Sequence, residues 1–116
     1  MALNAMPGLV VKTRLVGEDA SVITAIGELD FATRDELVEM LTQIEELGTH
    51  DLILDLRELA FIDSAGLHVL VAAHRRALAG GWRFQIVCGP GRVWRALALS
   101  GLTTELQFVS RAPGEA

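Results

Sequence analysis

The distribution of apolar and polar residues along the chain predicts an alternation of short strands and amphipathic helices. Two runs rich in Val, Ile and Leu, residues 9–16 and 21–26, are separated by the turn residues 17–19 and predict a β-hairpin. Residues 51–56 and 82–87 predict two further strands, and residues 106–109 a short last one. Gly27 interrupts the second run, and we expect that strand to end there.

Residues 33–47 carry the clearest helical pattern. Apolar side chains recur at helical spacing and predict one buried stripe, made of Leu37, Met40, Leu41, Ile44 and Leu47. Thr33 is the expected N-cap, and Glu36 three residues later completes a capping box. Gly48 is the expected end of the helix.

Two more helices follow. The second begins at the segment 63–67, runs to about residue 79 and ends at Gly80 and Gly81. Its predicted stripe consists of Leu67, Leu70, Val71, His74 and Leu78. The third spans 92–99 and ends at Gly101.

The order of these elements predicts an α/β fold. Strands joined through helices favour parallel pairing with right-handed crossovers, and the opening hairpin adds an antiparallel edge. We therefore expect a single domain over residues 1–116, with a mixed sheet, an N-terminal hairpin and three to four helices packed on it. Its core covers about 9–109, and residues 110–116 form a flexible tail.

Composition narrows the functional classes. The chain has 116 residues, of which 51% are apolar, and a formal net charge of −5, which argues against a nucleic-acid partner. No apolar run approaches the roughly 20 residues that span a bilayer, so we expect a cytoplasmic protein without membrane contact. Cys88 and the histidines show no metal-ligand spacing, so no metal or other cofactor is assigned.

The chemically informative segment is Asp63–Ser64, between the strand over 51–56 and the second helix. Either residue fits the purely structural role of helix N-cap. Ser64 as a catalytic nucleophile lacks both the Gly-x-Ser-x-Gly pattern and an oriented base, because His68 and His74 lie along the helix that follows. Ser64 as a phosphate acceptor is the third alternative. A helix N-terminus tolerates the added negative charge, whereas a closed interface beside Asp63 does not.

Two segments then make a family resemblance visible. Asp63-Ser64-Ala65-Gly66-Leu67 after an apolar strand, and Gly27-Glu28-Leu29-Asp30 after the second strand, together resemble the STAS domain family. The chain is most similar there to bacterial anti-sigma-factor antagonists, over about residues 9–109. It departs from the pattern at Ala65, where many relatives have a second Ser or Thr.

The resemblance implies a transcription regulator and not an enzyme. Ser64 corresponds to the serine that an anti-sigma factor with serine kinase activity phosphorylates and that a protein phosphatase restores. Unphosphorylated, such a protein binds the anti-sigma factor and frees the sigma factor. Positions carried over to the partner-binding surface are Asp30, Asp63, Ser64, Ala65, Gly66, Leu67 and His68, with Gly66 giving room for the partner's backbone.

Two matters stay open from the sequence. STAS subunits of signalling complexes or lipid-transport ATPases share this fold without controlling a sigma factor, and they are the alternative function. Homodimerisation is compatible with the sequence and not decided by it.

We also expect Cys88 to be a buried small apolar residue and Trp94 to be partly exposed.

Overall fold

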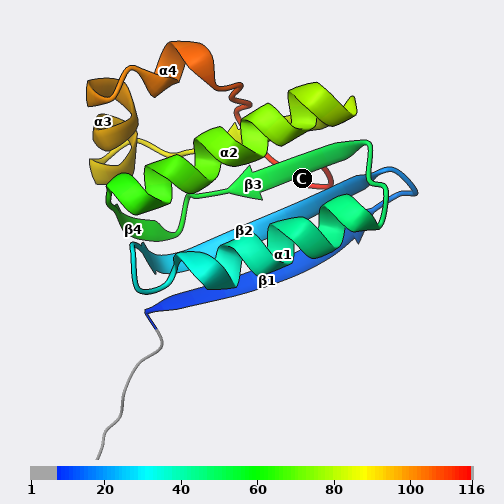
Figure 1. Ribbon diagram of the computed structural model, residues 1–116, viewed down its shortest axis with the longest axis horizontal. Helices are drawn as coiled ribbons and strands as arrows, with labels where there is room; N and C mark the ends of the chain where they lie inside the picture. The colour runs from blue at the N-terminus through cyan, green and yellow to red at the C-terminus, as the bar shows by residue number, and fades with distance from the viewer. Residues whose placement is uncertain (1–7, 116) are drawn as a thin grey trace, which may run out of the picture.

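The computed structural model describes residues 8–115 and shows a mixed five-stranded sheet with two long helices on one face (Figure 1). No helix within residues 8–115 is long and apolar enough to cross a membrane. The chain runs through β1 (Leu9–Val16), β2 (Ala20–Leu29), α1 (Arg34–Glu46), β3 (Asp51–Asp55), β4 (Leu59–Ile62), α2 (Ser64–Gly80), β5 (Arg83–Val87), α3 (Arg92–Leu99) and α4 (Leu102–Glu105).

The sheet has the order β1-β2-β3-β5, with β4 paired to β2. β1 and β2 form the expected antiparallel hairpin, while β2–β3, β3–β5 and β2–β4 are parallel pairs. The predicted fold class is therefore confirmed.

β2 is longer than the sequence pattern indicates, because Gly27 does not end it. The strand has an irregular register between Gly27 and Glu28 and continues to Leu29. Gly27 has φ of +112°, and a Cβ there would lie 2.4 Å from the Gly8 carbonyl oxygen. The residue thus marks a bulge, after which β2 leaves β3 and pairs with β4.

Three assignments of secondary structure differ from the prediction. Residues 59–62, expected to be a connection, form β4. Residues 102–105 form the short helix α4, and residues 106–109 contribute only a single bridge, from Phe108 to Ile86, in place of a strand. These segments are too short for periodicity to distinguish a strand from a helix.

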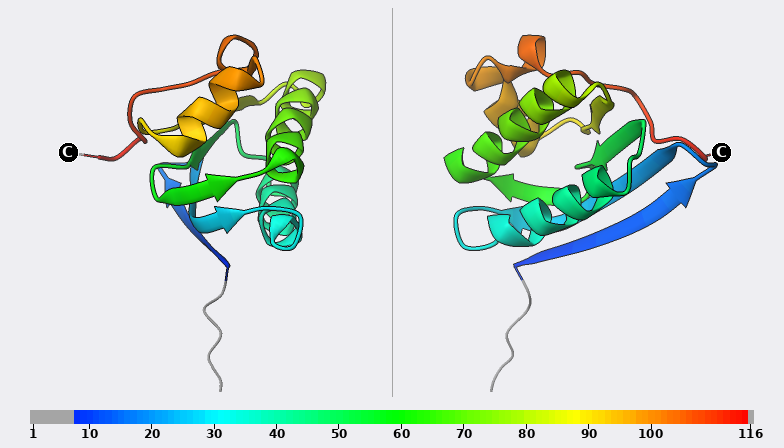
Figure 2. Two further views of the ribbon diagram at one scale, coloured as in Figure 1. Left: turned by 90° about the vertical axis from the view of Figure 1, so that its left-hand side faces the viewer. Right: turned by 45° about the vertical axis from the view of Figure 1, so that its right-hand side comes forward.

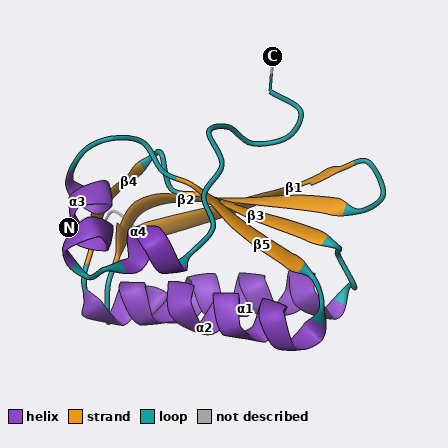
Figure 3. Cartoon of the chain, turned by 90° about the horizontal axis from the view of Figure 1, so that it is seen from above, coloured by secondary structure: helices purple, strands orange, loops and turns teal. Residues whose placement is uncertain are grey.

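The main core lies between the sheet and the two long helices, α1 and α2 (Figure 3). Leu37, Leu41 and Ile44 of α1 are buried as expected, but Leu47 is 75% exposed. On α2 the predicted stripe is only partly right: Leu70 is buried, and Leu67 and Val71 pack against the main core from partly buried positions. The buried face consists of Gly66, Val69, Leu70, Ala73 and Ala77, whereas Leu78 is 67% exposed. Small residues face the sheet and allow the helix to approach it closely.

A second, smaller core covers the opposite face of the sheet. It consists of Val22, Ile53, Val87 and Ala112, with Val16 and Val109 packed against it. Ala112 belongs to the segment expected to be a flexible tail, yet it is only 2% exposed. The Arg14 guanidinium also donates to the Pro113 carbonyl at 2.8 Å. The chain therefore packs against the domain up to residue 115.

Candidate functional site

Asp63 connects the start of α2 to the loop that follows β2. One carboxylate oxygen accepts from the Gly66 N–H at 3.0 Å, which makes Asp63 the N-cap of α2. The other accepts from the Phe31 N–H at 3.2 Å. The Asp63 N–H itself donates to the Leu29 carbonyl at 3.2 Å. These bonds hold the β2–α1 loop against the helix terminus.

Ser64 is the first residue of α2 and its side chain is exposed. Because Asp63 supplies the cap, the sequence alternative that Ser64 is itself the cap is wrong. Within residues 8–115 the Ser64 hydroxyl makes no hydrogen bond. A solvent-exposed hydroxyl with no internal partner is chemically available for modification.

Asp30 lies beside Asp63 because the strands before them end at paired residues, Leu29 and Ile62. Its carboxylate organises its own turn by accepting from the Ala32 and Thr33 N–H groups, both at 3.0 Å. The acidic pair therefore lies at one end of the sheet, on two adjacent loops (Figure 1).

The capping box predicted at Thr33 is absent. Thr33 is at the N-cap position of α1, but its hydroxyl makes no capping bond. It donates instead to the Glu28 carbonyl at 2.8 Å and accepts from the Asp30 N–H at 3.0 Å. This hydroxyl thus ties the turn at Asp30 to the end of β2.

The remaining predicted partner-binding residues differ in their accessibility. His68 is exposed, Ala65 is half-buried, and Leu67 is half-buried and packed on the main core. Gly66 is buried against this chain's own backbone: a Cβ there would lie 2.8 Å from the Leu29 carbonyl oxygen. The closeness of the domain's own strand β2, and not room for a partner, accounts for this glycine.

Phe31 is a feature of this end of the molecule that sequence reasoning missed. Its side chain is 71% exposed, and the Arg34 guanidinium carbon lies 4.7 Å from the centre of its ring. The available signal was a lone aromatic residue in a turn, between Asp30 and the start of a helix. We call Asp30, Phe31, Asp63, Ser64, Ala65 and His68 the switch surface.

A groove between α1 and α2 opens beside this surface. It encloses about 230 Å³ and is lined by Arg34, Asp35, Val38, Ala65, His68, Val69, Ala72 and Arg76. Ala65 and His68 belong both to the groove and to the switch surface. We refer to it as the α1–α2 groove.

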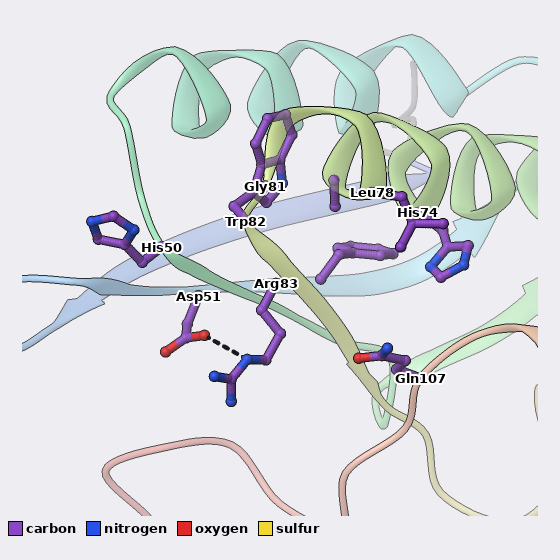
Figure 4. Close-up of a pocket in the computed structure, with 10 residues that line it drawn as sticks. His50, Asp51, His74, Leu78, Gly81, Trp82, Arg83 and Gln107 are labelled. Atoms are coloured by element: carbon purple, nitrogen blue, oxygen red, sulfur yellow. Dashed lines mark ion pairs between the residues drawn. The ribbon is translucent and has the colours of Figure 1, made fainter.

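A larger hollow of about 550 Å³ lies at the other end of α2 (Figure 4). Its lining includes His50, His74 and an ion pair between Arg83 and Asp51 at 3.2 Å. His74 lies ten positions after Ser64 on α2, which is about 15 Å along the helix axis. The hollow is therefore distinct from the switch surface, and His50 and His74 are not bases for Ser64.

An ionic network fastens the end of β3 to the C-terminal segment. Arg57 donates to both carboxylate oxygens of the buried Asp55, at 3.0 and 2.8 Å, and also pairs with Glu115. Burial alone would raise the pKa of Asp55, but its hydrogen bonds with Arg57 outweigh that and lower it. The same arginine lowers the pKa of Glu115. The network joins the end of β3 and the loop after it to Glu115, and so anchors the C-terminal segment.

Cys88, after β5, is half-buried and packs against the main core, so the expected burial is only partly realised. Burial, and then the charge of Asp55, raise the pKa of its thiol. Trp94 is 36% exposed, as expected, and meets Phe108 edge-on with 5.1 Å between ring centres.

Comparison with known proteins identifies the family to which this chain belongs. The profile described as STAS domain matches residues 12–115, and the chain therefore belongs to the STAS domain family. The anti-sigma-B factor antagonist of Staphylococcus aureus (strain NCTC 8325 / PS 47) is 32% identical over 76 residues, which cover 66% of this chain and 70% of the relative. The osmosensory protein A of Mycobacterium tuberculosis (strain ATCC 25618 / H37Rv) is 32% identical over 74 residues, covering 64% of this chain and 46% of that protein.

Solved structures agree on the fold. An anti-sigma factor antagonist from Mycobacterium paratuberculosis superposes with a TM-score of 0.83 at 23% identity, covering 94% of this chain and 92% of its own. The anti-sigma factor antagonist SpoIIAA in its unphosphorylated form gives a TM-score of 0.72 at 21% identity, covering 88% and 90%.

Proposed function

We propose that this protein is an anti-sigma-factor antagonist controlled by phosphorylation of Ser64. Unphosphorylated, it binds an anti-sigma factor that is also a serine kinase, and so frees a sigma factor. Phosphorylated, it dissociates until a protein phosphatase removes the phosphate. In this role the chain is a binding partner and a kinase substrate and not itself an enzyme.

The observation that carries the proposal is that the Asp63 side chain makes structural hydrogen bonds at the start of α2, whereas the Ser64 side chain makes none within residues 8–115. Asp63 caps α2 and holds the Phe31 N–H, whereas the exposed Ser64 hydroxyl takes no part in the fold. A group at this position can be modified without removing a structural contact. The name of the Staphylococcus aureus relative, an anti-sigma-B factor antagonist, supports the same function.

Electrostatics explain why a phosphate at Ser64 would act on binding and not on folding. A phosphoserine carries about −1.5 to −2 charges, which the positive end of a helix dipole accommodates. An interface closing over Asp30 and Asp63 would have to bury that charge next to two carboxylates. A loss of about 3–4 kcal/mol there lowers affinity more than a hundredfold.

Ser64 should be the residue that accepts the phosphate group. Incubation with ATP and an anti-sigma kinase encoded in the same genome should add one phosphate group to the intact chain, and peptide mass spectrometry should place it on Ser64. Ser64→Ala should abolish incorporation. Ser100→Ala, which removes another exposed serine, should not.

Two outcomes would contradict the proposal. Phosphate on any other residue would remove Ser64 from the switch. Co-purification of the chain with a transporter or a different signalling complex, and with no ATP-binding anti-sigma factor, would favour the alternative of a STAS subunit in another assembly.

A further inference from the structure

The exposed ring of Phe31 is held in place, unlike the tip of an ordinary loop. Its backbone N–H is bound by Asp63, and Arg34 covers one face of the ring. Phe31 is 71% exposed, whereas Phe84 is 3% exposed and Phe61 37%. Water contact with so much apolar surface is unfavourable, and a fixed aromatic side chain loses little conformational entropy on binding. These are the properties of an interface anchor.

The α1–α2 groove offers the complementary feature, a hollow. Val38, Ala65, Val69 and Ala72 give it an apolar floor. Its volume of about 230 Å³ corresponds to roughly eight water molecules at about 30 Å³ each, enough for one large apolar side chain.

The rim of the groove carries the carboxylate of Asp35 and two arginines, which differ in how firmly they are paired. Arg76 is already neutralised by Glu45, with two hydrogen bonds of 2.8 and 2.9 Å. Arg34 has a weaker tie: Asp35 lies 3.9 Å away and its side chain is 90% exposed, so water screens that pair. Arg34 is therefore the rim cation available to an incoming carboxylate.

We propose that Phe31 and the α1–α2 groove extend the switch surface into one docking site for the anti-sigma factor. The inference rests on the proposed function and specifies the partner's chemistry. The partner supplies an apolar socket for Phe31, an apolar side chain for the groove, and a carboxylate for Arg34. The groove shares Ala65 and His68 with the switch surface, so the docking site is continuous with Ser64.

The same arrangement gives a physical reason for release. A phosphate on Ser64 places negative charge at the mouth of the groove, where it repels the partner's carboxylate. It also attracts the Arg34 guanidinium, since arginine pairs strongly with phosphate. Phosphorylation of Ser64 then removes the attraction between Arg34 and the partner's carboxylate and adds a repulsion between that carboxylate and the phosphate.

The test is the affinity of the unphosphorylated protein for the purified anti-sigma factor, measured by calorimetry without ATP. Phe31→Ala and Ala72→Leu, which fills the groove, should each weaken binding at least tenfold. Arg34→Gln should weaken it less and should reduce its dependence on salt concentration. Leu15→Ala is the matched control, because Leu15 is 69% exposed and pairs with Ser21 beside the β1–β2 turn. That turn lies at the end of the sheet away from the start of α2 (Figure 2).

The outcomes separate this docking site from the function on which it rests. If wild type binds and Ser64→Asp weakens binding, while Phe31→Ala and Ala72→Leu bind within twofold of wild type, the docking site is wrong and the switch stands. If wild type does not bind, both are wrong. The melting temperature of each variant is measured alongside its affinity. If a variant binds more weakly but melts close to wild type, the loss is a surface effect and supports the docking site. If binding is weaker only in variants whose melting temperature also falls, the docking site is wrong.

Discussion

At the scale of single residues, neighbouring positions in the segment 63–66 have different tasks. Asp63 closes the helix terminus and the adjacent loop, Ser64 faces solvent, and Gly66 packs against β2. Structural contacts therefore account for the presence of Asp63 and Gly66, whereas nothing in the fold requires a hydroxyl at Ser64. That contrast is the reason to look for the function of Ser64 outside the folded domain.

Replacement of Gly66 tests the structural half of this division. In Gly66→Ala the new Cβ would lie 2.7 Å from Ile62 Cγ1 and 2.8 Å from the Leu29 carbonyl oxygen. A backbone oxygen cannot rotate away, so overpacking of about 1–3 kcal/mol should exceed the roughly 1 kcal/mol that alanine gains in helix propensity. We expect a lower urea midpoint. Gly89→Ala is the control, because its Cβ would meet its nearest neighbour at 3.8 Å. Equal midpoints for wild type and Gly66→Ala would contradict this account.

At the scale of secondary-structure elements, the sequence predicts what periodicity controls. The apolar stripe of α1, the hairpin and the parallel strands follow from spacing alone, and the two motifs indicated where β2 and α2 meet. The short elements β4 and α4 could not be predicted, because four residues carry no period. The buried face of α2 was predicted only in part: Leu70 lies on it as expected, but close packing favours Gly66, Ala73 and Ala77 over Leu78. The packing of the tail depends on tertiary contacts that no local pattern encodes, and so does the hydrogen bond from Phe31 to Asp63.

The attachment of the C-terminal segment to β3 makes a pH-dependent prediction. Asp55→Asn should destabilise the domain at neutral pH by about 1–3 kcal/mol, because Arg57 loses a charged partner that is nearly buried. The folded-state pKa of Asp55 lies below its ordinary value of 3.8. Its contribution is therefore present above pH about 4 and is lost as pH falls through the folded-state pKa.

Urea unfolding from pH about 7 to about 3 measures this effect. The difference in stability between wild type and Asp55→Asn should shrink at the acid end. Asp35→Asn, with a side chain that is 90% exposed, should differ from wild type by no more than about 0.5 kcal/mol near neutral pH. A deficit in Asp55→Asn that stays constant over the whole range would show that lost packing, and not charge, causes it.

At the scale of the whole molecule, most of the residues that stabilise the fold lie away from Ser64. The main core lies between the sheet and the two long helices, and the second core lies under the C-terminal segment. The switch surface is confined to one end, where the β2–α1 loop and the start of α2 meet (Figures 1 and 2). The hollow at the other end shares no residue with it. A charge added at Ser64 therefore has little folded structure to disturb.

Ser64→Asp makes this separation measurable. The carboxylate adds negative charge at the first position of α2, where the helix dipole is favourable, so the melting temperature should stay within about 2 °C of wild type. Binding to the anti-sigma factor should fall toward the more than hundredfold loss expected for phosphate, because the same charge then faces Asp30, Asp63 and the partner. Ser64→Ala, which removes the hydroxyl without adding charge, should keep both stability and binding. A large fall in the melting temperature of Ser64→Asp would assign Ser64 a structural role, whereas unchanged binding would place the partner's contact elsewhere on the domain.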